Sequence, residues 1–358
     1  MNILITSPSL NPLLNISGIS SVVKTIVKLK TYRFIHYQLG REDSNTYNIS
    51  WVLKQFFLPI NFSIYLKKYH IDIVHINIPL DTFGVLRDAL LFIISKSLGK
   101  KIVLHIHGGK FLTETPPIVI KSIIKSLFKY ADLIIVLSDL EKKEVSKSYN
   151  CEDRINVLSN CVEDLYGESI KFFCQKPLIF TILFLGRIHE SKGINEIINA
   201  FKILKKSHES HRFKFVLCGT GPLLSHSLVA FENILGDDFE YRGVVSGEEK
   251  IDIIKKADIF LLPSKFEGLP LSLLECMCAG VVPITTDVGS IKLVVNHNIN
   301  GLIIKKEDPV GLSENIIELI KNIPLLCRLS ANSRKTILDN FNVSTFHRKL
   351  SDIYSALL

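Results

Sequence analysis

The sequence of 358 residues lacks several features that define common classes of protein. No apolar run reaches the roughly 18–20 residues that a helix needs to cross a bilayer. The nearest candidate, residues 89–106, is interrupted by Lys96, Gly99, Lys100 and Lys101. The first residues, MNILITSPSL, carry no basic segment ahead of the apolar ones, so we expect no secretory signal. These absences favour a protein that is made and kept in the cytosol.

The cysteines exclude two further classes. There are seven of them, scattered along the chain, and no C-x-x-C occurs. An odd and dispersed set in a chain of this length is unlike a secreted disulfide framework. We therefore expect a reducing compartment, no structural zinc site, and cysteines that act mostly as small buried apolar side chains. The absence of G-x-G-x-x-G after the first predicted strand disfavours a nicotinamide-dependent dehydrogenase.

The composition is 47% hydrophobic, which is ample for two cores, and the length exceeds that of a usual single domain. The net charge of +8 is uneven: residues 50–130 carry 11 Lys and Arg against 4 Asp and Glu, interleaved with Phe, Leu and Ile. This stretch is either an ordinary solvated surface or one that docks on anionic lipid or an anionic acceptor. We expect no nucleic-acid partner, because no binding module is recognisable.

Short apolar runs alternate with segments of helical periodicity, which is typical of parallel α/β domains. The predicted strands of the first half are 2–6, 33–37, 71–77, 101–107, 133–138 and 155–159, separated by helices near 19–30, 83–98, 117–130 and 139–148. The predicted strands of the second half are 179–186, 214–219, 239–243, 258–263, 281–286 and 301–305.

We therefore predict an α/β fold of two doubly wound Rossmann-like domains that face each other across a crevice, where open parallel sheets bind ligands. The predicted boundaries are a first domain at 1–165, a linker at 166–177, a second domain at 178–340 and a C-terminal helix at 341–358 that can pack back on the first domain.

Two glycine-containing loops follow strands of the second half. The first carries Arg187 and Lys192 between Gly186 and Gly193, and two cations at a helix N-terminus suit an anion such as phosphate. The second, LCGTGPLL, places Gly219 and Gly221 in a turn ahead of Pro222. Either loop alone is also compatible with an ordinary strand-to-helix connection.

The segment FEGLPLSLLECMCAG carries the strongest signal, because it holds two carboxylates eight positions apart in an otherwise apolar run. Pro270 suits the first turn of a helix, so Glu267 lies on the preceding loop and Glu275 in the second helical turn. The residues that enter this helix are Gly268, Leu269, Pro270 and Leu271. The uncapped N-terminus of this helix could bind a diphosphate. Glu275 could accept hydrogen bonds from the hydroxyls of a ribose, and Glu267 from the hydroxyls of a sugar. The alternative is a helix-capping acid plus an exposed acid.

Together these motifs resemble the donor-binding domain of retaining glycosyltransferases of the GT-B fold, specifically glycosyltransferase family 4 (glycosyl transferases group 1). The family's G-R-x4-K-G loop is matched by Gly186, Arg187, Lys192 and Gly193. Its G-x-G-P turn is matched by Gly219, Gly221 and Pro222, and its E-x7-E signature by Glu267 and Glu275. The match extends over about residues 179–315. The resemblance implies that the second domain binds a nucleotide-sugar donor and the first an acceptor.

The first half resembles the family more loosely. Where the family has a loop with paired glycines after the first strand, this chain keeps only Gly18, with Ser17 in the other place. LHIHGGKF resembles the segment whose histidine faces the donor sugar, and His107 matches that histidine. His105 shares the same strand face and is expected to be a satisfied core histidine, although an H-x-H pair can also bind metal.

The resemblance implies transfer of a hexose or N-acetylhexosamine from a nucleotide diphosphate sugar, with a UDP-sugar favoured, to a saccharide or lipid-linked saccharide in cell-surface polysaccharide synthesis. It implies front-face attack with retention, His107, Glu267, Arg187 and Lys192 as catalytic residues, and no cofactor. The absence of D-x-D agrees with metal-independent chemistry. The expected location is the cytoplasm, with peripheral contact to the inner face of an anionic plasma membrane. Two alternatives stay open, a nucleotide-sugar epimerase of the same fold and a non-catalytic sugar-nucleotide-binding subunit.

Overall fold

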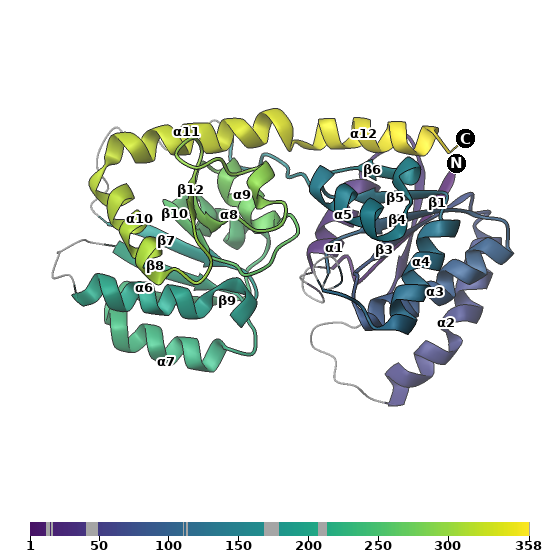
Figure 1. Cartoon of the computed structure of the whole chain (residues 1–358), viewed down its shortest axis with the longest axis horizontal. Helices are drawn as coiled ribbons and strands as arrows, with labels where there is room; N and C mark the ends of the chain where they lie inside the picture. The colour runs from purple at the N-terminus through teal and green to yellow at the C-terminus, as the bar shows by residue number, and fades with distance from the viewer. Residues whose placement is uncertain are drawn as a thin grey trace. The chain divides into compact units, whose positions relative to one another are not determined.

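The computed structural model describes residues 1–11, 15, 17–40, 49–109, 111, 114–167, 179–206 and 213–357. They form two compact units, whose elements are labelled in Figure 1. Unit 1 comprises Met1–Asn160 and Val343–Leu358, and unit 2 comprises Cys161–Asn342. The predicted linker, 166–177, lies outside the described residues except for Tyr166 and Gly167. No helix of the described part is long and apolar enough to cross a bilayer.

Unit 1 is built on a six-stranded parallel sheet in the order β2-β1-β3-β4-β5-β6. The strands are β1 (Asn2–Ser7), β2 (Arg33–Gln38), β3 (Ile73–Ile78), β4 (Lys101–Ile106), β5 (Leu133–Val136) and β6 (Ile155–Val157). The helices are α1 (Gly18–Val27), α2 (Ile49–Lys68), α3 (Thr82–Ser97), α4 (Ile118–Tyr130), α5 (Asp139–Tyr149) and α12 (Val343–Ser355). Strand order reverses between β1 and β3, which is the switch point where such sheets bind ligands.

Unit 2 repeats this plan with a second six-stranded parallel sheet in the order β12-β11-β10-β7-β8-β9. The strands are β7 (Phe180–Leu185), β8 (Phe213–Cys218), β9 (Phe239–Gly243), β10 (Ile259–Leu262), β11 (Val282–Thr286) and β12 (Leu302–Ile304). The helices are α6 (Ile194–Lys206), α7 (Leu224–Leu235), α8 (Gly247–Lys256), α9 (Leu271–Cys278), α10 (Pro309–Lys321) and α11 (Ile323–Asn340). Its switch point lies between β7 and β10.

The central strands are buried on both faces, which explains their largely apolar sequences. Every residue of β3, β5 and β10 is buried, whereas the edge strands β2 and β9 are partly exposed. Each unit has its own apolar core of strand residues and covering helices. The prediction of a two-domain, doubly wound α/β fold is confirmed.

The helix ranges predicted for the first half omit α2 (Ile49–Lys68). Proline lacks an amide hydrogen and usually breaks a helix, and Pro59 lies inside α2. The hydroxyl of Ser63 donates a hydrogen bond to the Pro59 carbonyl oxygen, 2.9 Å away, in the helical turn that follows the proline. Packing of Phe62 and Leu66 in the core of unit 1 holds the helix despite the proline.

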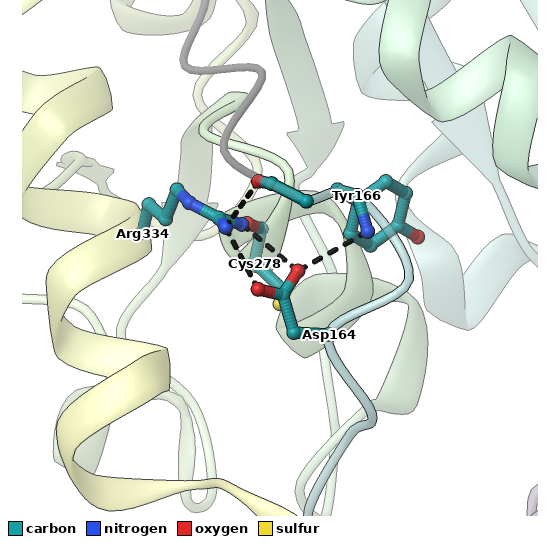
Figure 2. A network of polar contacts seen from close by, with 5 residues as sticks. Asp164, Tyr166, Cys278 and Arg334 are labelled. Atoms are coloured by element: carbon teal, nitrogen blue, oxygen red, sulfur yellow. Dashed lines mark hydrogen bonds and ion pairs between the residues drawn. The ribbon is translucent and has the colours of Figure 1, made fainter.

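The chain passes between the units twice, after Asn160 and after Asn342, and the two passages lie side by side. The amide of Val162 donates to the Phe341 carbonyl, 3.0 Å away, and Val162 pairs with Asn342 as a parallel bridge. Close to this bridge, within unit 2, the Arg334 guanidinium of α11 makes a bidentate ion pair with Asp164 at 2.8 and 3.1 Å (Figure 2).

The same guanidinium also donates to the carbonyls of Cys278, at the end of α9, and Gly167 (Figure 2). Arg334 therefore holds the segment that enters unit 2 against α9 and α11. Desolvation opposes ionisation of Asp164, but the hydrogen bonds and the charge of Arg334, together with the backbone hydrogen bonds of Tyr166 and Gly167, outweigh it and lower the pKa of the carboxyl.

Candidate active site

The loops at the carboxyl ends of β7 and β8 contact each other through backbone atoms. A Cβ on Gly219 would lie 1.8 Å from the Gly186 carbonyl oxygen, and one on Gly221 would lie 2.2 Å from that of Ile188. The amide of Gly186 donates to Cys218 and that of Ile188 to Thr220. Glycine is thus required at 219 and 221 to allow this approach, which is a structural reason for the G-x-G pair beyond ligand binding.

Two more glycines hold the loop after β10. A Cβ on Gly193 would lie 2.1 Å from the Pro263 carbonyl oxygen, and one on Gly289 would lie 1.8 Å from that of Glu267. The first contact joins the predicted phosphate loop to the segment that carries Glu267. The second, which sequence reasoning missed, joins the loop after β11 to the same segment.

These contacts bring two predicted catalytic residues together. Lys192 Nζ lies 2.6 Å from Glu267 Oε1, although the residues are 75 positions apart in sequence. Glu267 is only 6% exposed, and the same oxygen accepts a hydrogen bond from the Ser264 hydroxyl, 2.8 Å away. Arg187 lies on the same loop as Lys192 but is exposed. The result is a buried carboxylate with a fixed orientation at the edge of the sheet.

The helix α9 follows this loop and begins at Leu271, so Pro270 is its N-cap residue and not, as predicted, part of its first turn. No side chain caps this N-terminus. Leu269 is buried, and the carbonyl of Gly268 accepts a hydrogen bond from the Ser290 amide, 3.1 Å away. The partial positive charge of an uncapped helix N-terminus therefore stands immediately after the Lys192–Glu267 pair.

Glu275 occupies the second turn of α9, as predicted, and is partly exposed while its neighbours Leu274 and Cys276 are fully buried. Its Oε1 lies 2.6 Å from Nζ of Lys250, on α8. Sequence reasoning missed Lys250, because nothing in the sequence links α8 to α9. The pair explains how a carboxylate is tolerated in this apolar segment.

A second cluster connects the same two loops. Lys265 Nζ lies 2.8 Å from Glu307, 3.1 Å from Glu190 and 3.9 Å from Glu196. Hydrogen bonds to Glu307 and Glu190 raise the pKa of the Lys265 amine. Because Lys265 lies two residues before Glu267, this cluster reinforces the arrangement of the Lys192–Glu267 pair. No sequence motif pointed to it.

In unit 1, His107 follows β4, and its Nε2 lies 2.6 Å from Oδ1 of Asn77, on β3. The amide nitrogen of Asn77 donates to the Thr6 carbonyl, 2.7 Å away, so Oδ1 is the acceptor and His107 Nε2 the donor. Burial lowers the pKa of His107 to about 3, so its ring is neutral and Nδ1 carries a lone pair.

Two other buried histidines lie next to His107. The rings of His105 and His107 are 4.0 Å apart, His105 Nδ1 lies 3.2 Å from His75 Nε2, and His75 Nδ1 lies 2.6 Å from the Tyr354 hydroxyl of α12. His105 is in the core, as predicted, but only half satisfied, because its Nε2 has no partner among the described residues. The described residues contain no group of three or more His, Cys, Asp or Glu that could hold a metal ion.

Gly18 is the first residue of α1, where the Ser17 hydroxyl accepts a hydrogen bond from the Ile19 amide, 3.1 Å away. Residues 12–14 and 16 of the preceding loop lie outside the described residues. The predicted site residues are therefore divided: Gly18 and His107 belong to unit 1, and the others to unit 2.

Comparison with known proteins agrees with this geometry. The family model described as "Glycosyltransferase Family 4" matches residues 44–164, and that described as "Glycosyl transferases group 1" matches residues 176–336. The first match lies in unit 1 except for its last four residues, and the second lies in unit 2. The chain belongs to the family 4, group 1 glycosyltransferases.

Among curated relatives, an uncharacterized glycosyltransferase of Methanocaldococcus jannaschii is 27% identical over 72% of this chain and 69% of its own length. The amylovoran biosynthesis glycosyltransferase AmsK of Erwinia amylovora is 26% identical over 64% of this chain and 58% of its own. The crystal structure of Anabaena HepE in complex with UDP-glucose superimposes with a TM-score of 0.76 at 16% identity, covering 99% of this chain and all of that one. This likeness shows the GT-B fold. Membership of this family makes the protein a glycosyltransferase.

Proposed function

We propose that the protein transfers a hexose or N-acetylhexosamine from a nucleotide diphosphate sugar, with a UDP-sugar favoured, to a saccharide or lipid-linked saccharide in cell-surface polysaccharide synthesis. The observation that carries this proposal is the Lys192–Glu267 pair on the loop that enters the uncapped helix α9. An anion site and a sugar-binding carboxylate then occupy the same edge of the sheet. The names of AmsK and of the HepE complex with UDP-glucose support the polysaccharide context and the donor type.

In this proposal, unit 2 binds the donor. The amides at the start of α9, with Lys192 and Arg187, bind the diphosphate and stabilise the charge that develops on it as it leaves. Glu275 accepts hydrogen bonds from the ribose hydroxyls. Glu267 is oriented by Lys192 and Ser264 and accepts one from a hydroxyl of the transferred sugar.

The proposed reaction retains the anomeric configuration without a protein nucleophile. The acceptor oxygen bonds to the anomeric carbon on the face from which the diphosphate departs, and its proton passes to the departing phosphate oxygen. His107 positions the sugar and supports the positive charge that develops at the anomeric carbon, through its neutral ring or its backbone carbonyl. The protein cations would replace a divalent metal ion, in agreement with the absence of D-x-D.

The test is a screen of nucleotide sugars by thermal stabilisation, followed by product analysis with saccharide and lipid-linked acceptors. We expect a UDP-sugar to stabilise the wild type and Glu275→Ala to weaken that binding at least tenfold. Arg187→Ala should lower turnover at least tenfold, and chelator should not change wild-type turnover.

Three outcomes would overturn parts of the proposal. A product formed without any acceptor would indicate an epimerase. Donor binding without turnover on any acceptor would indicate a non-catalytic subunit. Activity lost with chelator and restored by manganese would assign the diphosphate to a metal ion.

A further inference from the structure

Three helices of unit 1, α2, α3 and α4, lie side by side over one face of its sheet, with α3 between the other two (Figure 1). Their inward faces form the apolar core with the strands. Their outward faces also carry large apolar side chains, which we call the apolar face. It consists of Phe57, Ile60 and Ile64 of α2, Phe83, Leu86, Leu90 and Ile93 of α3, and Ile118 and Val119 of α4.

The apolar face is a continuous feature of the helices and not scattered single residues. On α2 and α3 its members recur at intervals of three and four, so each set forms one row along its helix. Phe83 is 86% exposed and Ile118 85%. An apolar surface that extends over three neighbouring helices is unusual for a protein with no partner there, and it marks an interaction site.

On α3, Leu86, Leu90 and Ile93 form an exposed apolar stripe, whereas Ile94 and Leu98 pack against the core. The cations beside that stripe are engaged in ion pairs. Arg87 lies 2.6 Å from buried Asp88, and Lys96 lies 2.7 Å from Asp132.

Exposed lysines instead continue the apolar rows of the outer helices. On α2, Lys67 and Lys68 follow Ile64 by one helical turn. On α4, the three exposed lysines Lys121, Lys125 and Lys129 follow Ile118 and Val119. Because the strands of this sheet are all parallel, the three helices that follow them run in one direction. On α2 and α4 the apolar residues therefore precede the lysines in that common direction, whereas the apolar row of α3 runs along nearly the whole helix.

We propose that the apolar face and its lysines bind the surface of an anionic lipid bilayer. The apolar side chains enter the interfacial region, and the lysines lie at the level of the lipid phosphates. Charge complementarity selects this occupant over a second copy of the chain, because self-association would place the lysines of two copies near one another. The proposal goes beyond the glycosyl transfer proposed above and does not depend on it.

The test is sedimentation of the full-length protein with vesicles of phosphatidylcholine alone or with 30% phosphatidylglycerol, at low and high salt. We expect binding to the anionic vesicles only, and at least a fivefold weakening by salt. The triple variant Ile60→Ser, Phe83→Ser, Ile93→Ser should bind at least fivefold more weakly at low salt. The triple variant Lys121→Ser, Lys125→Ser, Lys129→Ser should also bind at least fivefold more weakly at low salt.

Matched controls come from exposed residues of unit 2. Val229→Ser, Ile299→Ser, Val310→Ser replaces three exposed apolar side chains, and Lys202→Ser, Lys205→Ser, Lys206→Ser replaces three exposed lysines of one helix. Both should bind like the wild type, with unchanged circular dichroism in all variants. Equal binding to both vesicle types, or equal loss in test and control variants, would overturn the proposal. If sedimentation velocity shows a dimer of the wild type and a monomer of the apolar triple variant, the partner of the apolar face is a second copy of the chain.

Discussion

At the scale of single residues, the two glutamates of the E-x7-E segment are held by lysines from other parts of the chain. Glu267 is buried and pairs with Lys192, whereas Glu275 is partly exposed and pairs with Lys250. A buried carboxylate needs a partner, so Lys192 has two functions. It orients the Glu267 carboxylate, and in the proposed function it also supplies a cation to the phosphate site.

The Lys192–Glu267 pair predicts a measurable coupling energy. Lys192→Met removes one of the two side-chain partners that buried Glu267 has among the described residues and leaves Ser264, and we expect this variant to lower the free energy of unfolding by about 2–3 kcal/mol. Adding Glu267→Gln to that variant should restore much of the loss. Urea unfolding of the four proteins gives the coupling.

The pair of Lys292 and Asp287, which are about half exposed and 4.0 Å apart, is the control. Lys292→Met and Asp287→Asn should show a coupling below about 0.5 kcal/mol. Equal couplings for both pairs would contradict a special role for burial at Glu267.

At the scale of elements, the site depends on loops that touch through their backbones. The ends of β7, β8, β10 and β11 approach so closely that Gly193, Gly219, Gly221 and Gly289 have no room for a Cβ. These contacts fix Lys192 and Glu267 relative to each other before any ligand arrives. The glycines of the proposed nucleotide-binding loops therefore have a packing function as well.

Gly219→Ala should be strongly destabilising, because its Cβ would lie 1.8 Å from the Gly186 carbonyl oxygen and its φ is +133°. We expect a loss of at least about 3 kcal/mol in the free energy of unfolding. Gly236→Ala is the matched control, since Gly236 also has a positive φ, +56°, but nothing within 4 Å of its Cβ position. Backbone strain alone should make it cost about 1–2 kcal/mol. Similar losses would show that strain at φ, and not the loop contact, is what matters.

The histidines of β3 and β4 predict a dependence of stability on pH. Burial lowers the pKa of His75 and of His107 to about 3, against an ordinary value of 6.5. Between these values the unfolded chain binds more protons than the folded one, so stability falls as the pH drops below 6.5. From pH 7 to pH 5 the loss should approach about 2 kcal/mol per histidine.

Urea unfolding from pH 5 to pH 8 measures this slope. His107→Asn should reduce this slope by nearly the contribution of one proton. His226→Asn, at an exposed position of α7, should leave the slope unchanged. A wild-type stability that is flat from pH 5 to pH 7 would mean that the cluster is protonated without cost.

At the scale of the whole molecule, one topology occurs twice, and the chain passes between the two units at neighbouring positions. The last helix, α12, belongs to unit 1 although it follows α11 of unit 2. The Tyr354 hydroxyl of α12 is hydrogen-bonded to His75 of β3, so the end of the chain completes the polar cluster next to His107. Within unit 2, the ion pair of Arg334 with Asp164 holds the segment that follows Asn160.

Arg334→Lys should show how much this passage depends on a fork-shaped cation. Lysine keeps the charge but cannot reproduce the bidentate pair with Asp164 and the bonds to two carbonyls. We expect a loss of about 2–3 kcal/mol in the free energy of unfolding and faster proteolysis between residues 160 and 167. Arg348→Lys, at an exposed position of α12, is the control and should change neither. Unchanged proteolysis in Arg334→Lys would show that the Val162 bridge alone holds the segment.

The sequence by itself determined the strands and the architecture. Buried parallel strands are short apolar runs, and such runs are visible without any knowledge of contacts. The positions of Glu275 in the second turn of α9 and of His107 after β4 also followed from local patterns. The helix α2 did not, because Pro59 is a local signal against a helix and packing overrides it.

Only the tertiary structure decided which charges meet. Lys192 and Glu267 are 75 residues apart, Lys250 and Glu275 are 25 apart, and Arg334 and Asp164 are 170 apart. Each contact depends on the order of strands in the sheet and on which loops that order places side by side. Local propensity carries no information about this order, because any parallel arrangement buries the same apolar runs. The pattern of residues therefore fixes the elements, and long-range packing fixes the partners of the charged side chains.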